Sequence, residues 1–258
     1  MGERISLERL NLRKPKEYDY GMDTETVKSR IRFYCIAEGA TEESYLEGVK
    51  NNKVFLKIKN EVVIEVIEKE DGQKTMSHPK QLVQAALTSM GRLDAEGNEN
   101  PPEEWKNQCQ WDKYDSTLDK VCVIFDKDCR DLEKYWDEIY EACKKHGIQI
   151  IVSNPNFELW LLMHFPEVSQ YDPKKLQENK KNLRGQIDKT ASKKKKYLEI
   201  LVARNAEGYK KGNSLKFERF MPGIELAMEQ AKLFCENPEE LKDNLGTSMG
   251  KLLAQMKE

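Results

Sequence analysis

Short apolar runs alternate with amphipathic segments from residue 31 onward. Four runs have the length and β-branched content of buried strands, at 31–37, 62–67, 121–125 and 148–152. The segments that follow them have the composition and spacing of helices, at 41–48, 79–90, 131–146 and 153–165. This alternation predicts an α/β fold in which a mostly parallel central sheet carries helices on both faces.

Residues at the segment boundaries predict where the helices begin and end. Thr41 is a candidate N-cap, and Glu42 and Glu43 then suit the positive end of the helix dipole, which favours a structural over a catalytic role for both acids. Asn154 is expected to cap the last of these helices, with Pro155 at its first position. Gly147 is expected to end the helix over 131–146.

Outside this alternation the chain changes in character. Residues 1–30 are polar, with basic Arg13, Lys14 and Lys16, and predict a mobile or draped arm before a core over 31–168. Residues 91–118 predict a surface insertion that is either a lid or a variable excursion without a role. Residues 169–258 predict a helical appendage packed on or beside the core, with amphipathic helices over 222–236 and 241–256.

The appendage is locally basic. Its lysines and arginine form either a phosphate-contacting face or an ordinary solvated helix surface. They are Lys174, Lys175, Lys180, Lys181, Arg184 and Lys193 through Lys196.

Composition narrows the class of protein. The 258 residues are 38% hydrophobic and 34% charged, as in a soluble globular protein, and the net charge of -2 excludes global affinity for polyanions. The opening residues lack the apolar core of a signal peptide, and no run approaches the ~18 apolar residues of a membrane span. The six cysteines include no Cys-x-x-Cys pair. We therefore expect a cytoplasmic protein without membrane association, whose thiols are reduced.

Acidic side chains follow two of the predicted strands. Asp126 and Asp128 come after the run at 121–125, and in extended backbone they point to the same side while Lys127 points away. Glu38 follows the first strand, directly ahead of Gly39, where helix capping does not explain it. Carboxylates at this sheet edge suit Mg²⁺ or Mn²⁺, and one of them could move a proton. The predicted metal ligands are Glu38, Asp126 and Asp128.

Glu158 is the one acid in the apolar segment 153–165. A buried carboxylate without a partner is costly, so a cation or a basic side chain should relieve it. Three alternatives stay open: a metal-site role, a salt bridge to a lysine or arginine at the sheet edge, or exposure through a gap. His164, in the same segment, has no neighbouring His or Cys at ligand spacing, which favours a satisfied semi-buried histidine.

Three stretches together resemble a known family. Glu38-Gly39 and Phe125-Asp-Lys-Asp128 resemble the Toprim arrangement of topoisomerases, primases and OLD-type nucleases. The stretches 35–45, 123–128 and 153–165 more specifically resemble the RloB family, over about residues 30 to 256. The resemblance implies a Toprim-like fold, with Asp126 and Asp128 as metal ligands, Glu38 as general acid/base or metal ligand, and Glu158 as a further catalytic-site residue.

The resemblance also bears on partners and on the chain's end. The family is associated with bacterial restriction and abortive-infection loci, often beside an ATPase. The tail over 237–253 departs from the family's ending, so Thr247 and Ser248 are not assigned to the site. Whether identical chains assemble into a homo-oligomer is left open by the sequence.

These observations support one leading function and two alternatives. The leading hypothesis is a Toprim-type, Mg²⁺-dependent nuclease that cuts DNA or RNA and acts with an ATPase partner in anti-phage defence. The first alternative is a non-catalytic Toprim-fold subunit that binds nucleic acid or an ATPase. The second is a haloacid-dehalogenase-like phosphatase with Asp126 as nucleophile, which is disfavoured because two β-α units precede Asp126.

Overall fold

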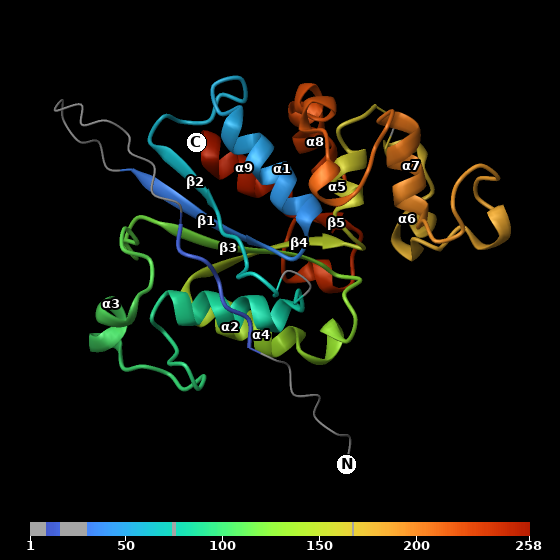
Figure 1. Cartoon of the computed structure of the whole chain (residues 1–258). Coiled ribbons are helices and arrows are strands. Elements are labelled where there is room, and N and C mark those ends of the chain that lie inside the picture. The colour runs from blue at the N-terminus through green and yellow to red at the C-terminus, as the bar shows by residue number, and fades with distance from the viewer. Residues whose placement is uncertain (1–8, 16–29, 74–75, 167) are drawn as a thin grey trace, which may run out of the picture. The chain divides into compact units, whose positions relative to one another are not determined.

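The computed structural model describes residues 9–15, 30–73, 76–166 and 168–258 (Figure 1). The strands are β1 (Ile31–Ala37), β2 (Val62–Val66), β3 (Lys120–Asp126), β4 (Ile148–Asn154) and β5 (Gly246–Thr247). The α-helices are α1 (Ala40–Asn51), α2 (Pro79–Ser89), α3 (Trp105–Gln108), α4 (Trp136–His146), α5 (Glu158–Leu162), α6 (Pro173–Glu178), α7 (Tyr197–Asn205), α8 (Ile224–Ala231) and α9 (Met249–Lys257). The strands form one mostly parallel sheet in the order β2-β1-β3-β4-β5, which confirms the predicted α/β class.

The chain divides into two compact units. The first comprises the described residues of 1–38, 60–123 and 130–149. The second comprises 39–59, 124–129 and the described residues of 150–258. The division into arm, core and appendage stays a prediction of the sequence.

The first unit contains the parallel pair β1 and β2, in register from Ile31 opposite Val62 to Cys35 opposite Val66. Helices α2 and α4 of this unit lie side by side (Figure 1). The His78 side chain accepts the Lys80 backbone N–H and so caps α2, which begins at Pro79 as expected.

Helix α4 is shorter than its amphipathic pattern suggests. Asp131 has a left-handed backbone, with φ of 60°, and a short 3₁₀ helix over Leu132–Lys134 follows it, so the α-helix begins only at Trp136. The predicted start at residue 131 is therefore wrong by five residues. Gly147 ends the helix with φ of 70°, as expected, because glycine adopts this conformation without a steric cost.

Residues 9–15 pack along the chain that follows β2. Leu10 and Leu12 are buried, Leu12 forms an antiparallel bridge with Lys69, and the Arg13 backbone N–H donates to the Glu68 carbonyl at 2.8 Å. This part of the arm is draped on the first unit. Lys16 lies outside the described residues.

The insertion over 91–118 is packed onto the same unit. The buried Trp111 ring stacks on Tyr34 of β1, with ring centroids 4.6 Å apart and the planes within 2°. Gly91 has φ of +73°, and a Cβ there would meet the Trp105 carbonyl and the Cys109 amide. These contacts fix the insertion at both ends, whereas a lid role stays a prediction.

The second unit corrects both predicted N-caps. Helix α1 begins at Ala40 after Gly39, so Thr41 lies inside the helix, where its Oγ1 accepts the Gly212 backbone N–H at 2.8 Å. Strand β4 continues to Asn154, whose side chain donates to the Leu241 carbonyl at 2.9 Å, and α5 begins only at Glu158. Each polar side chain thus serves a distant segment. Glu42 and Glu43 do lie in the first turn of α1.

The C-terminal part adds a strand that the sequence did not predict. The two-residue β5 pairs antiparallel with the end of β4, Ser153 opposite Thr247. The hydroxyls of these two residues are hydrogen-bonded at 2.9 Å, and Ser248 Oγ accepts the Val152 backbone N–H at 2.9 Å. Thr247 and Ser248 therefore have structural roles. Helices α8 and α9 fall within the predicted segments over 222–236 and 241–256, apart from the last residue of α9, but are shorter.

The lysine run at 193–196 is not helical, contrary to expectation. It leads into α7, and Lys196 forms an antiparallel bridge with Lys181. The six cysteines are free thiols, as predicted. Within the described parts of the chain, no helix is both long enough and apolar enough to cross a bilayer.

Candidate functional site

Within the second unit, the turn after β3 is hydrogen-bonded to the end of β4 and to the segment that follows it. The Lys127 and Asp128 backbone N–H groups donate to the carbonyls of Ser153 and Pro155, each at 2.9 Å. In return, the Phe157 backbone N–H donates to Asp126 Oδ1 at 2.8 Å. This exchange fixes the backbone that carries both predicted aspartates.

Asp128 has two donors of its own. Asn156 Nδ2 lies 3.3 Å and Lys196 Nζ 2.5 Å from its Oδ2. Since neighbouring residues, Asn156 and Phe157, contact Asp128 and Asp126, the two carboxylates face the same segment. The expected convergence of this pair is consistent with that geometry.

Glu158 opens α5 and is only 2% exposed. Its Oε1 accepts a hydrogen bond from the Tyr209 hydroxyl at 3.0 Å and lies 2.7 Å from Lys211 Nζ. The predicted basic partner is therefore present, but it comes from a loop near residue 211 and not from the sheet edge. The Glu158 carboxylate therefore has hydrogen-bonding and ionic partners within the chain.

The loop that carries Lys211 is held against α1. Thr41 Oγ1 accepts the Gly212 N–H, and Gly212 has φ of 75°, which a residue with a side chain rarely adopts. Lys211 is thereby held beside Glu158. Its ammonium also lies 3.7 Å from Glu199 Oε1.

The acidic side chains around Lys211 and Tyr209, which both bond to Glu158, change the pKa of each. Burial alone would lower the pKa of Lys211, but the Glu158 carboxylate, with smaller effects from Glu199 and Asp126, raises that pKa above its ordinary value. Burial raises the pKa of the Tyr209 phenol, and Glu158 raises it further. At neutral pH, Lys211 is therefore an ammonium and Tyr209 a neutral hydroxyl.

These side chains form one charged group, termed here the carboxylate–lysine cluster: Asp126, Asp128, Glu158, Lys196, Glu199 and Lys211. Glu199 joins its two ends, since it also accepts the Lys196 backbone N–H at 2.8 Å. Four carboxylates and two ammonium groups thus occur together in this cluster.

Sequence reasoning missed Tyr209, Glu199 and Lys211. The burial of Glu158 predicted a basic partner, but the chain has 43 lysines and arginines, and nothing in the local sequence distinguishes Lys211. Lys196 was identified only as one member of the lysine run.

Glu38 follows β1 and belongs to the first unit. Its backbone carbonyl accepts a hydrogen bond from Lys69 Nζ at 2.5 Å. Its convergence with Asp126 and Asp128 stays a prediction of the sequence.

Among the described residues, no group of three or more His, Cys, Asp or Glu side chains is arranged to hold a metal ion. A site at β3 would therefore rely on the two aspartates and on water. Mg²⁺ accepts such a set, because it commonly keeps several waters and takes one or two carboxylates.

His164 is a buried structural residue, as predicted. Its Nε2 lies 2.9 Å from the Tyr45 hydroxyl and its Nδ1 lies 2.9 Å from the Trp160 carbonyl. The aromatic rings of Tyr45, Trp160 and Phe220 pack around it. Burial lowers its pKa from 6.5 to about 4, so it is neutral in the folded protein at pH 7.

His164 should therefore make folding sensitive to acid. Its folded-state pKa lies below the unfolded value, so its favourable contribution is present above pH 6.5 and is lost as the pH falls toward 4. Between pH 7 and pH 5 we expect the wild type to lose about 2 kcal/mol more unfolding free energy than His164→Gln. Urea denaturation at both pH values measures this difference, and equal losses would contradict it.

The order of strands and helices along the chain argues against the haloacid-dehalogenase-like phosphatase. Two β-α pairs, β1 with α1 and β2 with α2, precede β3. Asp126 thus follows the third strand of the chain and not the first. This order bears out the reason for ranking that alternative last.

Comparison with known proteins identifies a family. The model of the RloB-like protein family matches residues 33–256, nearly the whole chain. Searches of curated proteins and of solved structures returned no match. The extent of the family match shows that this chain belongs to the RloB-like family.

Proposed function

We propose that this protein is a Mg²⁺-dependent nuclease of Toprim type that cuts phosphodiester bonds in DNA or RNA. The observation that carries the proposal is the end of β3, where Asp126 and Asp128 lie in a cluster that also supplies two lysines. Carboxylates can hold a hard cation, and lysines can hold phosphate oxygens. Metal-dependent phosphodiester cleavage can use both kinds of group.

The chain's own residues would divide the work as follows. The Phe157 N–H orients Asp126, and Lys196 would leave Asp128 to contact a phosphate oxygen when the cation binds. Lys211, held by Glu158, supplies a second positive charge. Mg²⁺ bound by the aspartates, or Mn²⁺ in its place, would offset negative charge in the transition state. The family resemblance assigns either proton transfer or metal ligation to Glu38 and a catalytic-site role to Glu158.

The basic appendage supports contact with a nucleic-acid strand. A cavity of about 450 Å³ is lined by Lys175, Lys180, Lys181, Tyr197 and Arg204, among others. Cationic side chains contact phosphates, and an aromatic ring offers a stacking surface for a base. These groups occur together on α6, α7 and the chain between them.

The biological setting rests on the family resemblance. We propose an abortive-infection role against phage, in the cytoplasm, together with an ATPase partner. Co-expression of the chain with the ATPase encoded beside it, followed by phage challenge, tests this setting separately from the chemistry.

A second candidate is a non-catalytic subunit that binds nucleic acid or the ATPase. The observation that favours it is the pairing already present in the cluster, Lys196 with Asp128 and Lys211 with Glu158. In such pairs each carboxylate already has a cationic partner without a metal. This candidate predicts nucleic-acid or ATPase binding without cleavage.

Incubation of the purified chain with single- and double-stranded DNA and RNA distinguishes the two. We expect cleavage of at least one substrate in Mg²⁺ or Mn²⁺, none in EDTA, and recovery when the metal is restored. The ATPase should be included in a parallel arm. Absence of metal-dependent products in both arms would contradict the nuclease.

A further inference from the structure

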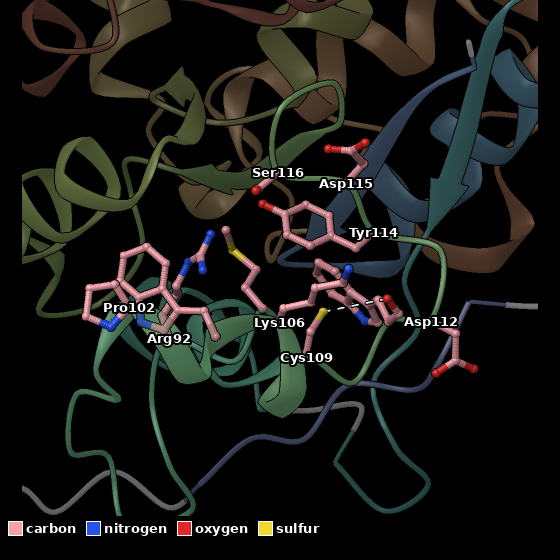
Figure 2. A pocket seen from close by; sticks show the side chains of 11 residues that line it. Arg92, Pro102, Lys106, Cys109, Asp112, Tyr114, Asp115 and Ser116 are labelled. Carbon is pink, nitrogen blue, oxygen red and sulfur yellow. Dashed lines mark hydrogen bonds between the residues drawn. The ribbon is translucent and has the colours of Figure 1, made fainter. Parts of the chain in front are cut away.

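A cavity of about 590 Å³ lies within the first unit, at the insertion before β3 (Figure 2). This volume falls in the range of small-molecule pockets, roughly 300–1,000 Å³. Its lining combines apolar, aromatic and cationic groups, among them Met90, Arg92, Trp105, Lys106, Trp111 and Tyr114. None of these residues has a part in the proposed nuclease chemistry.

Arg92 is a buried cation without a counter-ion. Its side chain lies over Trp105, with the guanidinium carbon 3.6 Å from the ring centroid, and the residue is only 8% exposed. Its Nε has no hydrogen-bond partner, and no carboxylate in the described part of the chain pairs with it. The polar side chain that its guanidinium meets is the Tyr114 phenol, which does not balance the charge. A buried charge in this state is costly. An anion in the cavity would satisfy it.

The other charged groups at the cavity do not remove the preference for an anion. Lys106 is exposed, lines the cavity, and makes no ion pair with any described residue. Asp115 already accepts the Thr117 N–H and hydroxyl, at 2.8 and 2.7 Å, and Asp112 lies 3.7 Å from Lys14. In Figure 2 the Asp112 carboxylate points away from Arg92. The Thr117 hydrogen bonds lower the pKa of Asp115 most and Lys106 adds a smaller effect, so Arg92 and Lys106 keep capacity for a ligand.

The aromatic side chains form a rigid wall. Trp111 is stacked on Tyr34, and Tyr114 meets Trp111 edge-on with ring centroids 6.0 Å apart. Burial raises the pKa of the Tyr114 phenol, against an opposing effect of Arg92, so its hydroxyl is neutral at pH 7. Fixed rings of this kind favour a flat ligand.

We propose that this cavity binds a nucleotide. The phosphate would occupy the side of Arg92 and Lys106, where charge-assisted hydrogen bonds are available. The base would lie against Tyr114, the partly exposed ring of this wall, behind which the buried Trp111 packs. This adds a ligand site to the first unit that does not depend on the proposed nuclease activity.

Calorimetric titration of the full chain with AMP, CMP, GMP and UMP tests the proposal. Matched nucleosides and inorganic phosphate are titrated in parallel. We expect at least one nucleotide to bind. Its nucleoside and free phosphate should each bind about tenfold more weakly or worse, because the nucleoside lacks the phosphate and free phosphate lacks the base. Nucleoside or phosphate binding as tight as the nucleotide would overturn the assignment, as would no binding of any nucleotide at millimolar concentration.

Variants locate the binding in the cavity. Lys106→Ala, at an exposed position that the fold does not need, should weaken binding about tenfold, and Arg92→Met by at least that much. Lys113→Ala is the matched control, an exposed lysine of the same insertion outside the cavity lining, and should bind as the wild type does. If Arg92→Met does not fold, the affinity of Lys106→Ala alone shows whether the nucleotide binds in the cavity. Unchanged affinity in Lys106→Ala would place the ligand elsewhere.

Discussion

Replacing Asp126 with asparagine should lower the rate of metal-dependent cleavage at least ~100-fold, and Asp128→Asn should do the same. Each substitution removes one negative charge but keeps the shape and an acceptor oxygen. The hydrogen bond from the Phe157 N–H to residue 126 can therefore persist. The loss would then report on charge at the end of β3 and not on folding.

Two controls separate this effect from general damage. Asp243→Asn changes an exposed aspartate of the second unit outside the carboxylate–lysine cluster, and it should cleave at the wild-type rate. Urea denaturation of all three variants should give midpoints close to that of the wild type. Full activity in Asp126→Asn would remove the basis for assigning catalysis to β3.

Replacing Lys211 with methionine should destabilise the protein by about 2 kcal/mol, because Glu158 would lose its basic partner inside the fold. This is less than the ~3–5 kcal/mol of a fully buried pair, since the Lys211 side chain is 44% exposed and solvent already screens part of the attraction. Denaturation in urea at pH 7 measures the change.

A double-mutant cycle tests the cause. Glu158→Gln combined with Lys211→Met should recover most of the lost stability, because no unpaired buried charge then remains. Lys210→Met, at the adjacent exposed lysine, is the matched control and should stay within about 0.5 kcal/mol of the wild type. If Lys211→Met behaves like Lys210→Met, the pair with Glu158 contributes nothing to folding.

The elements that were predictable from sequence are those whose signal is local. Strands β1 to β4 consist mostly of apolar, buried residues, and Asp126 and Asp128 follow the apolar run of β3. Two of the three wrong helix starts have a common cause, since Thr41 and Asn154 bond to Gly212 and Leu241, far along the chain. The third, at residue 131, follows from the left-handed backbone of Asp131. Propensity describes the capping preference of a residue but not a tertiary partner that competes for it.

The candidate site shows the same limit. The need for a partner to Glu158 followed from its apolar neighbours, whereas the identity of Lys211 depended on a loop 53 positions away. Strand β5 spans two residues, too short for any periodicity. Long-range pairing of this kind becomes visible only in the fold.

The central claim is that the end of β3 binds a metal ion. Its most direct test is a Mn²⁺ titration in the absence of nucleic acid, monitored by electron paramagnetic resonance. We expect the wild type to bind Mn²⁺, and the double variant Asp126→Asn/Asp128→Asn to bind it at least ~10-fold more weakly, because the two carboxylates are the proposed ligands. The control Asp243→Asn should match the wild type. Equal Mn²⁺ affinity in the double variant and the wild type would contradict the assignment of this site as a metal centre.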